Sequence, residues 1–152
     1  MGLGVSHGCW RGPYSAFMRW RKEVAKAAGL PPLTLMEGFY YEGGVQGDPF
    51  FMLSQHFKDD DNNIWQIKEM KESFPIKWSS LKRNPLHKLL YHSDCDGSIY
   101  KRDCLPIAKA LEKIIHLIPK HEEECMCERV KTQKFIDGLK LAHKNNEKVT
   151  FG

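Results

Sequence analysis

The chain has 152 residues, of which 41% are apolar and 28% are charged, and its formal net charge is +4. This composition is typical of a single globular domain, here residues 1–152, and no apolar run approaches the ~20 residues that cross a membrane. The small positive charge falls short of that of a dedicated nucleic-acid binder and leaves an anionic small ligand open as a partner.

The cysteines indicate a reducing compartment. Their number is odd, and no signal peptide precedes them; they are Cys9, Cys95, Cys104, Cys125 and Cys127. We therefore expect a cytoplasmic protein with free thiols, in the host cytoplasm if a phage encodes it.

The first third of the chain predicts a strand, a loop and a helix. Residues 1–7 are apolar and alternating enough for a strand, and the glycine-punctuated residues 8–13 are typical of a loop. Ser15 is then expected to cap a helix with Phe17, Trp20 and Val24 on its apolar face, ending near Gly29.

The middle third has weaker patterns. Thr34 and Glu37 have the spacing of a capping box, and residues 38–63 are expected to form a long loop or lid. Its acidic cluster, Asp59 to Asp61, is read as a solvated turn. Residues 74–78 then predict a strand, and residues 85–92 a short helix with Pro85 in its first turn.

The last third predicts two core helices and a closing strand. Residues 103–120 have helical apolar spacing, residues 121–129 read as a polar break, and residues 132–144 form the last helix before a strand at 148–151. The expected fold class is therefore α+β, with about four helices packed on a small sheet.

Residues 92–103 are similar to an EF-hand calcium loop. If His92 takes the first position, Asp94 and Asp96 fall at the third and fifth, Gly97 at the sixth and Asp103 at the twelfth. His92 offers nitrogen where calcium prefers oxygen, and Asp103 is one methylene shorter than the usual Glu. We therefore expect an EF-hand-like helix-turn-helix at 85–117 that closes without calcium, with Asp94, Asp96 and Asp103 as the ligands if a metal binds.

Pro106 adds an argument about where the following helix begins. Proline is best tolerated in the first turn of a helix, so we expect this helix to start near Asp103. The Asp103 carboxylate would then serve as the N-cap, and Gly97 would supply a positive φ for the turn.

The most promising ligand site is the segment from His7 to Tyr14. It leads into a helix N-terminus, which favours anions, and its Arg11 side chain can clamp a phosphate while Trp10 or Tyr14 stacks on a ring. The predicted ligand-binding residues are His7, Trp10, Arg11, Tyr14, Lys77, Trp78, His92 and Asp94. The competing interpretation places the aromatic rings in the core and the cations in solvent.

The other groups of candidate metal ligands and catalytic residues are incomplete. His92, Cys95 and Cys104 form one candidate zinc set, and His121, Cys125 and Cys127 form another, but neither has paired CxxC spacing. Cys9 with His7 is a candidate nucleophile and base without a third orienting group. We expect no catalytic constellation and no cofactor, with calcium as the alternative.

The sequence resembles a family of small proteins from bacterial, phage and prophage genomes. The resemblance covers most of the chain except roughly 41–73 and 118–131, and it rests on GVSHG, YSAF and Trp20 at 4–20, LMEGFY at 35–40, PIKW at 75–78, HSDCDGSI with DC at 92–104, and TQKFIDGL at 132–139. Ser98 stands where this family is expected to have an acidic residue, which weakens the calcium interpretation. The resemblance implies no established reaction.

By association only, a phage-type setting implies interference with host machinery or defence. One form is a non-catalytic sponge that sequesters an anionic, nucleotide-like host signal. The alternatives are an inhibitor that blocks a host protein through residues 38–56, and a small enzyme that uses His7, Cys9 or His92. An oligomer is compatible with each of them.

Overall fold

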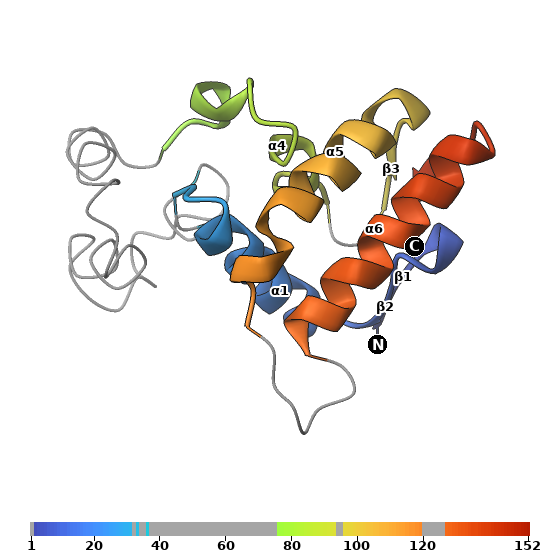
Figure 1. Cartoon of the computed structure of the whole chain (residues 1–152), viewed down its shortest axis with the longest axis horizontal. Helices are drawn as coiled ribbons and strands as arrows, with labels where there is room; N and C mark the ends of the chain where they lie inside the picture. Colours follow the sequence, from blue (N-terminus) through green and yellow to red (C-terminus); the bar gives the residue numbers. More distant parts are fainter. Residues whose placement is uncertain (1, 32, 34–35, 37–75, 94–95, 120–126) are drawn as a thin grey trace.

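The structure is a computed structural model, and it describes residues 2–31, 33, 36, 76–93, 96–119 and 127–152 (Figure 1). The predicted 38–63 loop and its acidic cluster, the capping box of Thr34 and Glu37, and the candidate ligand Asp94 lie outside these residues. No helix in the described part of the chain is long and apolar enough to cross a membrane.

The chain begins with an antiparallel hairpin. Strand β1 (Gly2–Val5) pairs with β2 (Trp10–Pro13) so that Val5 faces Trp10 and Leu3 faces Gly12, and a 3-10 turn, Ser6–Gly8, joins the strands. The prediction of a loop over 8–13 is therefore wrong for residues 10–13. Trp10 is buried with Leu3 and Val5 on one face of the hairpin, and this burial favours the strand despite the glycine and proline around it.

Helix α1 (Tyr14–Ala27) follows without a linker. Its N-cap is Pro13 rather than the predicted Ser15, because Pro13 has extended angles (φ −61°, ψ 148°) and the helix starts directly after it. The predicted apolar face is confirmed, since Phe17, Trp20 and Val24 are fully buried. The helix ends where Gly29 takes a φ of 68° and the Leu30 N–H donates to the Ala25 carbonyl, an arrangement that satisfies an end carbonyl.

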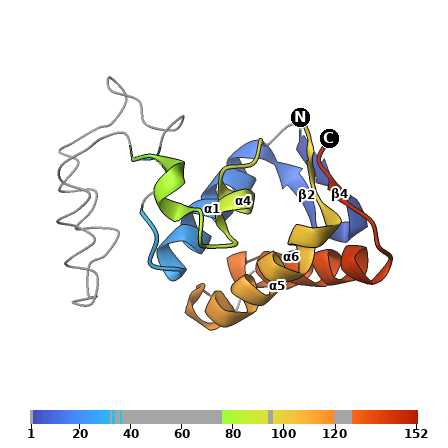
Figure 2. The ribbon, with the colours of Figure 1, turned by 90° about the horizontal axis from the view of Figure 1, so that it is seen from above.

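Three further helices complete the core. They are α4 (His87–Leu90), α5 (Lys101–Ile114) and α6 (Glu128–Lys144), and α5 and α6 lie side by side in Figures 1 and 2. The apolar stripe predicted for α6 is confirmed by the buried Phe135, Ile136 and Leu139.

Helix α6 also lies very close to the 3-10 turn that connects the hairpin strands. A Cβ atom placed on Gly138 would be 2.9 Å from the His7 carbonyl oxygen and 3.0 Å from the Cys9 amide nitrogen. Only glycine permits this approach, because backbone atoms cannot swing aside as the end of a side chain can.

The second sheet links the end of the chain to its beginning. Strand β3 (Ser98–Ile99) pairs with β4 (Val149–Thr150), so the predicted closing strand is confirmed. A single bridge joins Val5 to Phe151, and the Gly152 N–H donates to the Gly4 carbonyl at 2.9 Å. Residues 2–5 and 149–152 thus lie together, as Figure 2 shows, and the α+β prediction with four α-helices is confirmed for the described residues.

Three predicted element boundaries are wrong. Of the strand predicted at 74–78, only residues 76–78 are described, and among them Ile76 makes an isolated bridge with Met36 while a 3-10 helix begins at Trp78. Helix α5 starts at Lys101 instead of Asp103, because Gly97 (φ 88°) and the β3–β4 pairing leave Tyr100 extended at the N-cap. Helix α6 starts at Glu128, inside the predicted polar break.

Candidate functional site

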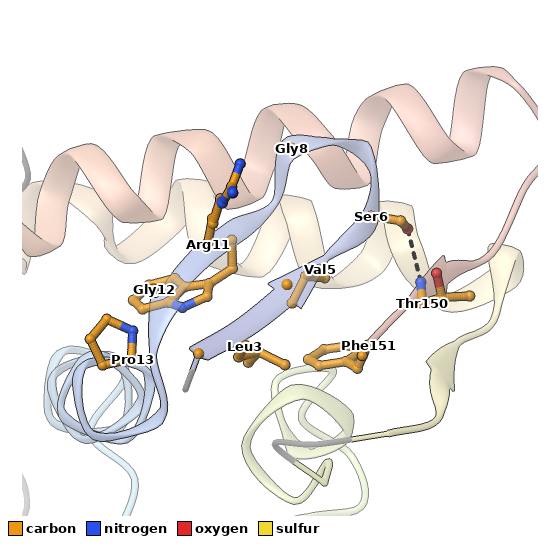
Figure 3. Close-up of a pocket in the computed structure, with 13 residues that line it drawn as sticks. Leu3, Val5, Ser6, Gly8, Arg11, Gly12, Pro13, Thr150 and Phe151 are labelled. Atoms are coloured by element: carbon orange, nitrogen blue, oxygen red, sulfur yellow. Dashed lines mark hydrogen bonds between the residues drawn. The ribbon is translucent and has the colours of Figure 1, made fainter.

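An open groove of about 900 Å³ runs along the hairpin and the last residues of the chain (Figure 3). It is lined by residues 2–6, 8, 10–13 and 150–152, of which Gly2, Gly4, Gly8, Gly12 and Gly152 are glycines. Segments from both ends of the sequence therefore build one surface. Among the described residues, this groove brings together predicted site residues Trp10 and Arg11, and His7 lies in the turn beside them.

The glycines keep side chains out of the groove. A Cβ atom at Gly2 would lie 2.9 Å from the Gly12 carbonyl oxygen, and one at Gly4 would lie 3.1 Å from the Gly152 carbonyl oxygen. Because larger residues would crowd these positions, the backbone itself lines much of the surface. A ligand can approach such a backbone closely.

Trp10 contributes a buried donor to this groove. Its ring is 6% exposed and packs against Phe17 and Trp20 at centroid distances of 5.1 and 5.3 Å, with the Lys131 ammonium 5.5 Å away. Its Nε1 atom has no hydrogen-bond partner among the described residues and lies 3.6 Å from where a Gly12 Cβ would be. A buried donor without an acceptor costs about 1–3 kcal/mol, so Nε1 favours an acceptor that enters from the Gly12 side.

Arg11 supplies the positive charge of the groove. It is exposed on β2, points away from Leu3 and Phe151 in Figure 3, and is the only charged side chain among the described residues that line the groove. Tyr14 is half-buried at the start of α1 and packs on the core. The groove is therefore a mainly apolar and backbone surface with one cation, which suits a small anion with an uncharged body.

Ser6 and His7 form a polar cluster at one end of the groove. The Ser6 Oγ atom accepts a hydrogen bond from the Thr150 N–H at 2.9 Å and lies 2.8 Å from His7 Nδ1. The opposite ring nitrogen, Nε2, lies 3.6 Å from a Glu147 carboxylate oxygen. His7 also has a left-handed backbone (φ 60°, ψ 20°), a conformation that costs energy and that often occurs at functional positions.

Sequence reasoning missed Ser6, Glu147 and residues 150–152. No local pattern marks them, because Ser6 and Thr150 are 144 residues apart and meet only through the bridge between the first and last strands. The closing strand itself was predictable, but its partner was not.

His92 lies next to the groove without lining it. Its ring stacks on Phe151 with centroids 4.1 Å apart, and its Cε1 atom would be 3.3 Å from a Cβ on Gly97. The imidazole thus packs between Phe151 and the turn at Gly97. Arg21, buried to 1% exposure, holds the same turn from α1 by donating from Nη1 to the carbonyl oxygens of Leu90 (3.1 Å) and His92 (2.7 Å).

The structure corrects the role predicted for Asp103. This residue lies in the first turn of α5 and is not its N-cap, and its carboxylate accepts a 2.7 Å bond from the Lys88 ammonium of α4. Asp96 is exposed, and no three potential metal ligands cluster within the described ranges. The EF-hand-like character of 85–117 and the absence of calcium stay predictions.

Lys77 and Trp78 lie apart from the residues that form the groove. Trp78 is 5% exposed and packs on His87 and Tyr91 at 5.9 and 5.7 Å, and Lys77 is exposed before the 3-10 helix. The structure therefore does not join this pair to Arg11 in one groove, and neither Lys77 nor Trp78 lies in a strand.

The Cys9 thiol is expected to be inert in the folded protein. Burial, and then the neighbouring Cys104, raises the pKa of Cys9 from 9.0 to about 12. Iodoacetamide at about pH 8 should therefore leave Cys9 unmodified until the protein unfolds, since the thiolate is the reactive form. Mass spectrometry of the alkylated peptides measures this, and rapid labelling of Cys9 in folded protein would contradict it.

The same pKa shift has a consequence for stability. The folded state holds the Cys9 proton more tightly than the unfolded state does, so the thiol contributes to the free energy of unfolding. This stabilising contribution is fully present below pH 9.0 and is lost as the pH rises toward about 12. Unfolding free energy measured over this alkaline range should fall less steeply in Cys9→Ala than in the natural protein.

Comparisons of the chain with protein-family models, with curated proteins and with solved structures find no match.

Proposed function

We propose that the protein binds a small anionic ligand in the hairpin groove and releases it unchanged. The observation that carries this proposal is the buried Trp10 Nε1 donor without a partner, beneath a glycine-lined surface that carries Arg11. An oxygen of the ligand would accept from Nε1 once the backbone at Gly12 shifts, and the Arg11 guanidinium would pair with the anionic group.

A nucleotide fits this arrangement best among small anions. Its phosphate suits Arg11 and the exposed backbone, and its base or sugar supplies an acceptor and apolar surface for the remainder of the groove. The resemblance to phage and prophage proteins favours a host signal as the ligand and sequestration as the result. Blocking of a host protein is the alternative in the same setting.

The test compares two neighbouring tryptophans. Trp20 Nε1 already donates to Thr132 Oγ1 at 2.9 Å, whereas Trp10 Nε1 has no partner in the described part of the chain. We expect ATP or cyclic AMP to raise the melting temperature, and both Trp10→Phe and Arg11→Ala to weaken binding about tenfold, the effect of losing ~1.4 kcal/mol. Trp20→Phe should lower stability and leave the nucleotide affinity unchanged.

Three results would overturn the proposal. They are the absence of stabilisation by any nucleotide, equal affinity losses in the two tryptophan variants, and stabilisation by inorganic phosphate alone to the same extent as by nucleotides. Calorimetry at a fixed salt concentration gives the affinities directly.

The cluster of Ser6, His7 and Glu147 supports hydrolysis as a second candidate function. The Ser6 Oγ would attack a carbonyl carbon or phosphorus while its proton passes to His7 Nδ1, and Glu147 would orient the imidazole through Nε2. The proton then passes to the leaving group, and water releases the Ser6 adduct in the same way. Of the three residues named for an enzyme, His7 supports this candidate best, because its ring lies next to Ser6 and Glu147 whereas the Cys9 thiol stays protonated.

The two candidates differ in what denaturation releases. A sponge returns intact nucleotide, whereas a hydrolase returns product and loses this activity in Ser6→Ala. A fluorophosphonate probe that labels Ser6 in the natural protein but not in His7→Ala would favour the enzyme.

A further inference from the structure

Two adjoining hollows lie on a surface formed by α5, by residues 82–88 and by Ala28, which follows α1. Their volumes are about 210 and 590 Å³, and both are lined by Arg83, Asn84, Pro85 and Pro106. None of the described residues that line them also lines the hairpin groove. We call the combined surface the basic hollow.

The described residues that line the basic hollow carry a formal net charge as large as that of the whole chain. Within the described part of the chain, five basic residues and one acidic residue line it: Lys82, Arg83, Lys88, Lys109, Lys113 and Asp103. Their net charge, five minus one, equals the +4 of the entire chain, in which 23 basic residues face 19 acidic ones. The rest of the sequence is therefore electrically balanced.

Most of these cations are available to a partner. Lys88 is paired with Asp103 at 2.7 Å, but no ion pair within the described residues engages Lys82, Arg83, Lys109 or Lys113. His87, between the cations, responds to their field. Burial lowers the pKa of this imidazole, and Lys88 and Lys82 lower it further.

The floor of the larger hollow is apolar. Ala28, Leu86, Ala110 and Ile114 line it, and Ala110 and Ile114 follow Pro106 at four-residue spacing along α5. Lys109 and Lys113 run beside this row with the same spacing. An apolar stripe bordered by cations is complementary to a segment that carries apolar and acidic side chains together.

We propose that the basic hollow binds an acidic, amphipathic segment of a partner protein. Leucine-like side chains of that segment would cover the floor, and its carboxylates would pair with Lys109, Lys113 and Arg83. Nucleic acid fits less well, because a phosphate backbone gains nothing from the apolar floor. This interaction does not depend on the ligand of the hairpin groove.

The test uses a labelled peptide of glutamate and leucine with helical spacing, and fluorescence anisotropy with the full chain. Lys109→Glu with Lys113→Glu should weaken peptide binding about tenfold or more, and binding should weaken with added salt. Lys22→Glu with Lys26→Glu is the matched control, because these exposed residues hold the same positions, ninth and thirteenth, in the 14-residue helix α1. The control should bind like the natural protein.

Three outcomes would overturn the proposal. They are equal losses in the two double variants, equal binding of a glutamate peptide that lacks leucine, and displacement of the peptide by single-stranded DNA of the same charge at lower concentration. Circular dichroism establishes that both double variants are folded before binding is compared.

Discussion

Replacing Gly138 by alanine is expected to lower the free energy of unfolding by about 2 kcal/mol or more. In a solvent-exposed helix this change gains about 1 kcal/mol, because alanine has the higher helix propensity. Here the new methyl group would meet the Cys9 Sγ, the His7 carbonyl oxygen at 2.9 Å and the Cys9 amide nitrogen at 3.0 Å. Overpacking costs about 1–3 kcal/mol, and more where rigid backbone must move. Urea unfolding measures the difference.

A double variant identifies which contact matters. Cys9→Ala removes the Sγ atom and leaves both backbone contacts in place, so Gly138→Ala should still destabilise a Cys9→Ala background. Full rescue in the double variant would show that only the thiol is in the way. A Gly138→Ala protein more stable than the natural one would contradict the close approach of α6 to the hairpin turn.

Arg21→Met is expected to cost about 3 kcal/mol or more. The substitution keeps most of the side-chain volume but removes the donors that satisfy the Leu90 and His92 carbonyls, and a buried acceptor left unpaired costs about 1–3 kcal/mol. It also removes the guanidinium that lies 4.6 Å from the centre of the Phe17 ring. The substitution should also destabilise the second sheet, because the Phe151 N–H next to β4 donates to the carbonyl of Gly97, which precedes β3.

Arg19→Met is the control for this variant. Arg19 is on the same helix, but its side chain is 67% exposed and its Glu128 contact is long, at 3.9 Å. Urea unfolding should show almost no change for it. Amide hydrogen exchange at Phe151 should accelerate in Arg21→Met alone, and similar effects of the two substitutions would refute the bracing role of Arg21.

The helices could largely be predicted from the sequence because their apolar spacing is strong. Phe17, Trp20 and Val24 in α1, and Phe135 and Leu139 in α6, are buried as their spacing indicates. The hairpin could not be predicted in full. Residues 10–13 contain glycine and proline, which favour a loop locally, and their strand conformation depends on pairing with β1 and on the burial of Trp10 by α1.

The start of α5 shows how a sound local argument can fail. Pro106 favours a helix that begins close to it, yet the helix begins at Lys101 and contains the proline. The position is set by contacts distant in sequence, since β4 pairs with β3 and leaves Tyr100 as the last extended residue. The carboxylate expected to cap the helix instead pairs with Lys88.

Only the part of the candidate site that is formed by residues close together in the sequence could be predicted. Arg11 and Trp10 could be selected because a cation and an aromatic ring stand among glycines before a helix, and the groove contains both. The wall formed by residues 150–152 and the contact of Ser6 with Thr150 arise from tertiary pairing, which no local pattern records.

The pairing of the first strand with the last residues also constrains how the protein folds. The Ser6 to Thr150 bond spans 144 residues, and the entropy of closing so long a loop must be offset before the contact stabilises anything. During synthesis the hairpin emerges well before residues 151 and 152, which pair with its free edge. Until those residues pair with β1, its unpaired backbone groups leave an open strand edge on the nascent chain.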